Sequence, residues 1–483
     1  MRRFLAATFA ILASSAVFAA GMGEDEARHL LSRTGYGVRL QEIDAYAKLS
    51  RREGVDRILD GARASAVTPL PPGIDEWVSP ARIRAMEAEA KKAAQAENRD
   101  RAGELRAWWV REMLATDSPL TERMTLFWHN HFATGIQKVR SPMMMARQNA
   151  ILRRHALGSF RDLLHGVSKD PAMLVYLDTA RSRRGAPNEN FAREVMELFT
   201  LGEGHYSERD IKEAARAFTG WSVDPETGGF LFRPMLHDDG EKTVLGRTGA
   251  LRGEDVLEIL LARRETAEFI AAKLWREFVS GAPPGERERR EIQGVARELR
   301  ESGYSVRAAL RALLSTQSFW APEHRAALVK SPVDVVVGTL RQFSVEVRDP
   351  LPFAVALRNL GQDLFAPPNV KGWPGGEAWV DSRTLLARRQ FVERVLRVDE
   401  ARLAMQAMAQ SPAMSDNKGR RFVQAIADLQ FSGDAWLAPF ASRPMPSTLE
   451  RVLLAQAPQR ERASETGIAL VRALVADPVY QLR

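Results

Sequence analysis

The chain has no cysteine among its 483 residues. This absence excludes disulfides, thiolate metal sites, cysteine nucleophiles and lipid attachment through cysteine. Any bound metal must therefore have nitrogen and oxygen ligands. The folded state must also be stabilised by its core, and a chain of this length has enough material for a large one.

Long apolar runs are also missing beyond the N-terminus. Arg2 and Arg3 precede the uncharged run from Phe4 to Phe18, and Val17 and Ala19 occupy the two positions that a signal peptidase reads. The run is shorter than the roughly 20 residues of a membrane-spanning helix. We therefore predict a signal peptide over residues 1–19, cleaved after Ala19, a periplasmic or secreted mature chain and no transmembrane segment.

The sequence lacks several motifs of hydrolases and nucleotide-binding proteins. It has no Gly-x-Ser-x-Gly elbow and no phosphate loop, and Ser382 has no histidine and acid at a diagnostic spacing. The formal net charge of +8 includes Arg2 and Arg3. An exported protein seldom meets nucleic acid, so this basic balance favours either a solvated surface or an anionic partner such as a glycan, another polymer or a membrane face.

Apolar residues recur mainly with the period of a helix, and strand-like runs are short and few. The best strand candidates are residues 229–233 and 343–347. The predicted helices cover residues 25–31, 40–49, 80–98, 103–115, 119–131, 143–155, 159–169, 171–177, 189–201, 208–218, 253–262, 266–279, 286–301 and 306–314. This pattern predicts an all-α protein, a multi-helical single large domain with a few short strands.

The composition changes near the C-terminal end of this pattern. Between Arg397 and Asn417, alanine, methionine, glutamine and serine replace the aromatic-rich pattern. We therefore divide the mature chain into a helical core domain, residues 20–396, and a C-terminal helical appendage, residues 397–483.

Two of the eight histidines, His129 and His131, lie two positions apart at the end of an apolar helix. Side chains at this spacing point about 200° apart on a helix, so both can face one metal only if the helix ends there. The following Ala-Thr-Gly sequence is a candidate for that end. Metal ligation, a hydrogen-bonded structural role and general acid or base catalysis all remain open for the pair.

Residues 189–201 place Asn190, Glu194 and Glu197 on one polar stripe. Carboxylates at i, i+3 share a surface and can ligate a metal or act as an acid–base pair. The alternative is a salt-bridged face, because Arg193 and Glu197 are spaced i, i+4.

The next acidic helix begins with a capping signature, Ser207 followed by Asp210, and continues with Glu213 and Arg216. The short connection between the two acidic helices predicts a helical hairpin. If their acidic faces meet, the like charges raise a carboxyl pKa or require a cation. Both an arginine–carboxylate network and a catalytic or metal site fit this pattern.

A polar loop brings His237 next to Asp238, and loops carry function more often than core helices do. With His129 and His131 these residues form a nitrogen and oxygen set suited to zinc, manganese or iron. The alternative is a capped turn. In the rigid segment around Trp373, the tryptophan either stacks on a sugar ring or fills the core.

Many ordered motifs between Glu26 and Leu396 resemble one bacterial family, the domain of unknown function 1800 family. The motifs that carry the resemblance are residues 120–124 (LTERM), 127–132 (FWHNHF), 188–194 (NENFARE), 196–202 (MELFTLG), Tyr206, Asp210, 212–217 (KEAARA), 219–221 (TGW), 237–238 (HD), Gly240, Lys242 and 367–376 (PPNVKGWPGG). The resemblance implies an exported protein without a settled activity. It also implies, as a partner, a second exported protein related to alkaline phosphatases and sulfatases.

These observations lead to a hydrolase or related enzyme acting on a cell-envelope or extracellular polymer, with or without a metal. We expect His131 to transfer protons, Glu194, Glu197, Asp210 and Glu213 to act as acids, bases or ligands, and Arg193 and Arg216 to orient an anionic group. The expected metal ligands are His129, His131, His237 and Asp238. The rival hypothesis is a non-catalytic secreted scaffold, or a binding partner of the phosphatase-like protein, in which the same groups form a buried network.

Overall fold

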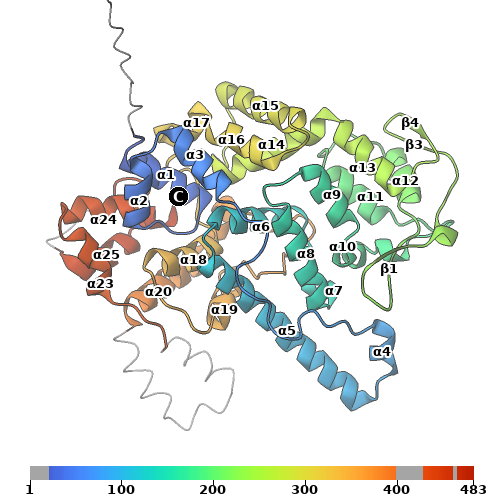
Figure 1. The fold of residues 1–483 in the computed structure, drawn as a ribbon, viewed down its shortest axis with the longest axis horizontal. Helices are drawn as coiled ribbons and strands as arrows, with labels where there is room; N and C mark the ends of the chain where they lie inside the picture. Colours follow the sequence, from blue (N-terminus) through green and yellow to red (C-terminus); the bar gives the residue numbers. More distant parts are fainter. Residues whose placement is uncertain (1–20, 399–427, 461–464) are drawn as a thin grey trace, which may run out of the picture.

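A computed structural model describes residues 21–398, 428–460 and 465–483 (Figure 1). The predicted signal peptide lies outside the described residues, and so does most of the compositional change between Arg397 and Asn417. Helices predominate in the described parts, with two small two-stranded sheets. The prediction of an all-α single domain with a few short strands is confirmed.

The first half of the chain forms short and medium-length helices around one long helix. These are α1 (Glu24–Thr34), α2 (Leu40–Ala47), α3 (Arg51–Asp60), α4 (Pro80–Ala85), α5 (Ala88–Ala115), α6 (Pro119–His131), α7 (Ile136–Val139), α8 (Pro142–Arg154), α9 (Phe160–Ser168), α10 (Pro171–Tyr176), η1 (Thr179–Arg181), α11 (Glu189–Glu197) and α12 (Glu208–Ala217).

The second half continues the helical pattern after the two sheets. Its helices are η2 (Pro234–Leu236), α13 (Gly253–Ala262), α14 (Arg264–Phe278), α15 (Glu286–Glu301), α16 (Val306–Leu314), α17 (Gln317–Trp320), η3 (Pro322–His324), α18 (Pro332–Gln342), α19 (Leu351–Asn359), η4 (Gly376–Trp379), α20 (Ser382–Leu396), α23 (Gly433–Leu437), η5 (Ala438–Phe440), α24 (Met445–Leu453), α25 (Gly467–Ala476) and η6 (Pro478–Gln481).

The boundaries around α5 differ from the prediction. We expected helices over 80–98 and 103–115, but the chain breaks at Met86 and then runs as one helix through Gly103. The break follows from the extended backbone at Met86 (ψ 147°). Gly103 does not end the helix because strong helix formers surround it, and one internal glycine costs only about 1 kcal/mol.

The strands form two antiparallel hairpins. In the first, β1 (Trp221–Val223) pairs with β2 (Phe230–Phe232), which confirms the strand expected at 229–233. In the second, β3 (Lys242–Val244) pairs with β4 (Arg247–Gly249) through Leu245 and Gly246, whose φ angles are 48° and 80°. Two positive φ angles are what the tight two-residue turn of such a hairpin requires.

The strand predicted at 343–347 is wrong. Phe343 is the C-cap of α18, and Ser344 adopts a left-handed conformation with φ 52°. Only Glu346 pairs in a strand-like manner, in an isolated bridge to Gln430. Phe343 of this run instead packs against the C-terminal helices. The centre of its ring lies 4.9 Å from the centre of the Trp436 ring.

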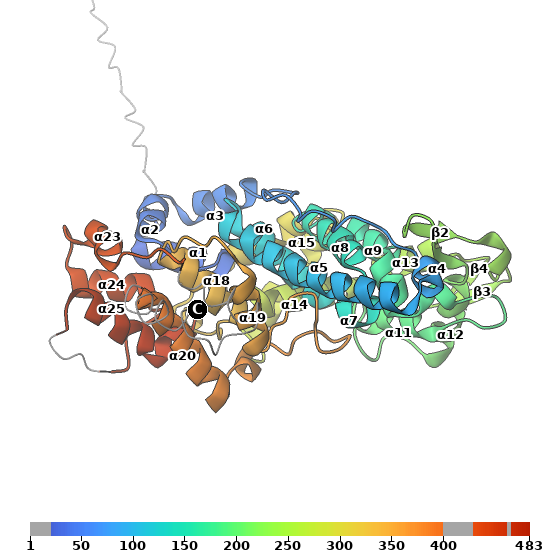
Figure 2. The same ribbon diagram turned by 90° about the horizontal axis from the view of Figure 1, so that it is seen from below.

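The described residues contain two large hydrophobic clusters. The first joins α1, α2, α5, α18, α19 and α20 to the C-terminal helices, and the second joins α6, α9, α11, α12, α13, α14 and α16. In both views the molecule is elongated, with α23, α24 and α25 at one end and the β3–β4 hairpin at the other (Figures 1 and 2).

The C-terminal residues that the structure describes share the core of the N-terminal helices. Leu449, Val452 and Val471 are buried in the same cluster as Ala27 of α1. The last residues pair with the segment before α18, where the Lys330 N–H donates to the Gln481 carbonyl (2.8 Å). No helix among the described residues is long and apolar enough to cross a membrane.

Candidate functional site

The two histidines of α6 point to different parts of the protein. The helix continues through His131, so the turn that would bring both rings to one side does not occur before it. His129 lies among the rings of Trp109, Phe365 and Trp373, at centroid distances of 5.5 to 5.6 Å. His131 lies beside Phe132 and Phe199.

Both ring nitrogens of His131 have partners. Nε2 lies 3.1 Å from the Phe199 carbonyl oxygen and Nδ1 lies 2.9 Å from Lys273 Nζ, so the neutral ring donates through Nε2 and accepts at Nδ1. Lys273 also donates to the Leu198 carbonyl (3.2 Å). These groups satisfy carbonyls at the C-terminus of α11, where positive charge is favourable. Burial lowers the pKa of His131 well below its usual value and that of Lys273 to about 8.

His129 is buried in a wholly aromatic environment. Its Nε2 has no hydrogen-bond partner among the described residues. Burial alone lowers its pKa to about 3, so the ring is neutral at physiological pH. Trp373, which contacts it, is 5 % exposed and fills the core, so the core alternative for this tryptophan holds.

Asn130, between the histidines, positions the segment 367–376. Its Oδ1 accepts a 2.6 Å hydrogen bond from the Trp373 N–H. A Cβ at Gly372, where φ is 83°, would lie 2.2 Å from the same oxygen, so only glycine fits there. Two of the sequence motifs therefore meet through the Asn130 side chain and the backbone of residues 372 and 373.

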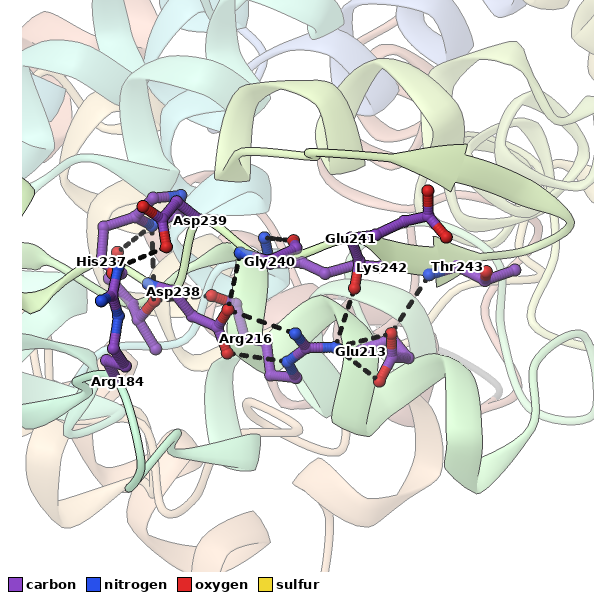
Figure 3. A network of polar contacts seen from close by, with 11 residues as sticks. Arg184, Glu213, Arg216, His237, Asp238, Asp239, Gly240, Glu241, Lys242 and Thr243 are labelled. Carbon is purple, nitrogen blue, oxygen red and sulfur yellow. Dashed lines mark hydrogen bonds and ion pairs between the residues drawn. The ribbon is translucent and has the colours of Figure 1, made fainter.

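Arg216 lies at the centre of the polar cluster shown in Figure 3. Its Nε donates to Asp238 Oδ2 (2.8 Å), and Nη1 donates to both Glu213 oxygens (3.0 and 3.1 Å). Nη2 donates to Asp238 Oδ1 (3.2 Å) and Nη1 also to the Glu241 carbonyl (3.1 Å). The hydrogen bond from Arg216 is the largest influence on the pKa of Asp238 and lowers it.

The remaining residues near this cluster also make structural contacts. Asp210 caps α12 with Ser207 and accepts from the Leu245 N–H (2.7 Å), and these bonds lower its pKa although burial raises it. His237 Nδ1 lies 2.9 Å from the Thr219 carbonyl. The Asp238 N–H donates to Thr219 Oγ1 (2.8 Å). The capping signature predicted at Ser207 is confirmed, and the loop at 237–240 is tied to the end of α12.

The expected metal ligands are not brought together. Among residues 21–398, 428–460 and 465–483, no three acidic or histidine side chains are placed to hold a metal ion. His129 and His131 diverge because they lie on a continuous helix, and Asp238 is bound by Arg216. The described residues therefore do not fit a metal held jointly by His129, His131, His237 and Asp238.

Helices α11 and α12 pack as the predicted hairpin, but Arg193 serves a different acid from the one expected. It forms a bidentate pair with Glu208 (2.8 and 2.9 Å) and a longer contact to Glu189 (3.6 Å). No ion pair of Arg193 with Glu197 is found among the described residues. Within the described residues, neither Glu194 nor Glu197 forms an ion pair with an arginine.

Glu194 and Glu197 lie one turn apart, on the face of α11 away from its buried side. Tyr206 donates a 2.6 Å hydrogen bond to Glu197 Oε2. Burial, and then the charge of Glu197, raise the pKa of the half-buried Glu194, against the opposing charges of Arg193 and Lys371. The Glu194 carboxylate has no hydrogen bond or ion pair within the described parts of the chain.

Three residues that the site prediction omitted border this pair. Tyr176 ends α10, and burial and the charge of Glu194 raise its pKa. Tyr206 precedes α12, and Lys371 belongs to the segment 367–376. Tyr206 and Lys371 stand in the motifs of the resemblance, which is the signal that could have found them; Tyr176 has no such signal.

The geometry defines a helical protein that has a partly buried acidic pair and a separate arginine–carboxylate cluster. A family model described as a protein of unknown function (DUF1800) matches residues 29–482. The chain therefore belongs to this family, as the resemblance implied, and the match includes the C-terminal helices. Neither the curated proteins nor the solved structures contain a match.

Proposed function

We propose that this chain is an exported enzyme that cleaves a cell-envelope or extracellular polymer by acid–base chemistry. Glu194 is the proton donor and Glu197 its partner. The observation that carries the proposal is a half-buried Glu194 that lies beside Glu197, has a raised pKa and forms no ion pair with Arg193, which pairs with Glu208 instead. A carboxylic acid whose pKa is raised by burial and by a neighbouring carboxylate is suited to donating a proton to a leaving group.

The neighbouring residues support distinct roles for the two acids. Tyr206 donates a 2.6 Å hydrogen bond to Glu197 and so fixes the position of that carboxylate beside Glu194. Lys371 contributes positive charge near Glu194, whose pKa it lowers. Lys138, 5.7 Å from the Tyr176 ring, is paired with Asp178 at 2.7 Å. An anionic glycan or another anionic polymer is the substrate that this charge favours.

The test uses the protein beginning at residue 20, incubated with purified peptidoglycan and with an acidic polysaccharide. Released reducing ends are measured against pH. We expect Glu194→Gln to lower the rate by about 10²- to 10⁴-fold, the usual contribution of a positioned acid or base. The wild-type rate should fall as the pH rises through the raised pKa of Glu194. Glu189→Gln, on the same helix and 38 % exposed, is the matched control and should keep the wild-type rate.

Full activity of Glu194→Gln would refute the assignment. Thermal unfolding of each variant separates a catalytic role from a structural one, because Glu194 has no described hydrogen bond to lose. An activity loss matched by a large fall in Tm would also count against a catalytic role.

A second candidate is a non-catalytic scaffold or a binding partner of a phosphatase- or sulfatase-like exported protein. It is favoured by the complete pairing of Arg216 and by the engagement of both nitrogens of His131. Wild-type protein that releases no ends from either polymer, but forms a stable complex with such a partner in size-exclusion chromatography, would support this candidate.

A further inference from the structure

A second polar region lies at the other end of the molecule, around α1, α18 and the C-terminal residues. Arg28 and Arg33 of α1, Arg123 of α6, Arg388 of α20 and Arg483 are all at most 6 % exposed. Lys330, directly before α18, is partly exposed beside them. Segments more than 300 residues apart thus bring six cationic side chains into one region, which we call the cation cluster.

Two carboxylates serve this cluster, and only two of its arginines pair with them. Arg123 pairs with Asp334 and with Glu277 (3.2 Å). Arg483 pairs with the same two acids, at 3.3 Å and 2.8 Å respectively. Within the described residues, Arg28, Arg33, Arg388 and Lys330 form no ion pair.

Backbone carbonyls compensate part of this excess charge. Arg33 donates to the carbonyls of Phe278 and Val279 (3.1 and 3.0 Å), at the C-terminal end of α14. Arg388 donates to the Lys330 carbonyl (2.8 Å), but its Nε and Nη2 have no partner among the described residues. Arg28 Nε and Arg483 Nη1 are buried without a partner as well.

Some of these groups line a small cavity. Its lining includes Arg28, Lys330, Asp334, Tyr480 and Arg483, and its volume is about 20 Å³. This is a small cavity, with room for a single compact ligand at most. Gly37 and Lys330 in the lining are partly exposed, so the cavity reaches the protein surface.

We propose that this cavity binds a small tetrahedral oxyanion, phosphate or sulfate, between Arg28, Lys330 and Arg483. Arg28, Lys330 and Arg483 line the cavity, and guanidinium groups match the oxygens of such anions. Asp334 is bound by Arg123, Arg483 and Ser331, and within the described residues it forms no ion pair with Arg28 or Lys330. The site is independent of the proposed role of Glu194.

Two features keep the cavity positive near neutral pH. Burial lowers the pKa of Arg28 to about 10, so this residue remains charged. Burial and the charges of Arg28, Arg388 and Arg483 lower the pKa of Lys330 to about 7, against the opposing charge of Asp334. Its Nζ lies 3.7 Å from the centre of the Tyr480 ring. Anion affinity should therefore decrease between pH 6 and pH 8, as Lys330 loses its proton.

The experiment measures binding to protein purified without phosphate or sulfate, by calorimetry and by thermal unfolding at constant ionic strength. Millimolar sodium sulfate and sodium phosphate should raise Tm in a saturable way, and sodium chloride should not. Arg28→Met and Lys330→Met keep the aliphatic stems and remove the charges, and each should raise the Kd for sulfate at least tenfold. Arg52→Met, whose side chain is 92 % exposed, is the control and should bind as the wild type does.

The same variants distinguish anion binding from a purely structural role of these cations. Without anion, Arg28→Met should unfold at the wild-type Tm or above it, because it removes a buried cation that forms no ion pair within the described residues and has only the charge of Asp25 to oppose its burial. The decrease of sulfate affinity with pH should disappear in Lys330→Met; sulfate is the probe here because it does not titrate in this range. Equal binding of glycerol 3-phosphate and inorganic phosphate would identify the phosphate group of a larger molecule as the ligand, and binding of the inorganic ions alone would identify the free ion.

The proposal is overturned if sulfate and phosphate act only as chloride does, or if Arg28→Met binds sulfate with wild-type affinity. A large loss of stability in anion-free Arg28→Met would also overturn it, since the cation would then have a partner within the protein.

Discussion

The cluster around Arg216 and the cation cluster differ in how far carboxylates pair with their arginines. At Arg216, one guanidinium is shared by two carboxylates, and a backbone carbonyl accepts a further bond. In the cation cluster, Asp334 and Glu277 pair with Arg123 and Arg483, and the other four cations form no ion pair within the described residues. A cation buried without compensation costs several kcal/mol, whereas a fully paired one is close to neutral for stability. The first region is therefore complete as a structural element, and the second lacks negative charge that a ligand can supply.

Removing a carboxylate from the cation cluster should have the largest effect. We expect Asp334→Asn to lower the free energy of unfolding by about 3–5 kcal/mol, because it leaves Arg123 and Arg483 with Glu277 alone. Urea denaturation measures this change. Asp239→Asn, at an ion pair with a 79 % exposed carboxylate, is the control and should change stability by less than about 0.5 kcal/mol. Equal effects of the two substitutions would remove the distinction between the regions.

The paired cluster should respond to loss of its cation with the opposite sign to Arg28→Met. We expect Arg216→Met to destabilise the protein by about 1–2 kcal/mol, because Glu213 and Asp238 lose their shared partner while remaining 20 % exposed. Chemical denaturation of Arg216→Met and Arg28→Met under the same anion-free conditions makes the comparison. Stabilisation by Arg216→Met would show that this cluster is not balanced either.

Raising the pH should increase the stability of the protein, because Lys330 in the cation cluster loses its charge. The pKa of Lys330 is lowered to about 7 in the folded protein, below the value of about 10.4 expected for the unfolded chain. Between these values the unfolded state binds more protons, so stability should rise with pH. After allowance for partial exposure we expect a contribution of about 1–2 kcal/mol between pH 7 and pH 9. Denaturation of wild type and Lys330→Met at both pH values measures it, and an unchanged slope in the variant would contradict the assignment.

The smallest effect is expected where charges are paired in solvent. Arg193 and Glu208 form a bidentate pair, but their side chains are 35 % and 68 % exposed. Arg193→Met should therefore lower stability by less than about 1 kcal/mol, and this difference should shrink in high salt. Thermal unfolding at low and high sodium chloride concentrations provides the measurement. A loss of several kcal/mol would mean that the α11–α12 contact depends on this pair.

Part of the candidate site could be predicted from the spacing of residues along the chain. Glu194 and Glu197 were placed on one face by the helical period, and Ser207 with Asp210 was recognised as a cap. The ion-pair partners of the arginines could not be predicted from this spacing. Arg193 is spaced to pair with Glu197 but binds Glu208 of the next helix, and Arg216 binds Asp238, which lies in a loop 22 residues further on.

The histidines illustrate the same limit. Their spacing in the sequence showed that both can face one metal only if α6 ends before His131. Whether it ends there depends on packing against Phe199 and Lys273, which come from α11's end and α14. Long-range contacts place His131 as a cap at the C-terminal end of α11 and place His129 among aromatic rings.

The helical class of this protein, the α11–α12 hairpin, the capping of α12 and the absence of any cysteine chemistry all follow from the amino-acid sequence alone. These features depend on residues within a few positions of one another or on composition. Only the tertiary structure decided which charges are neutralised and which are not. Arg28, Asp334 and Arg483 come from α1, α18 and the C-terminal end, and their contacts exist only after the helices have packed. Burial and charge compensation are sums over neighbours in space, so no local pattern along the chain can specify them.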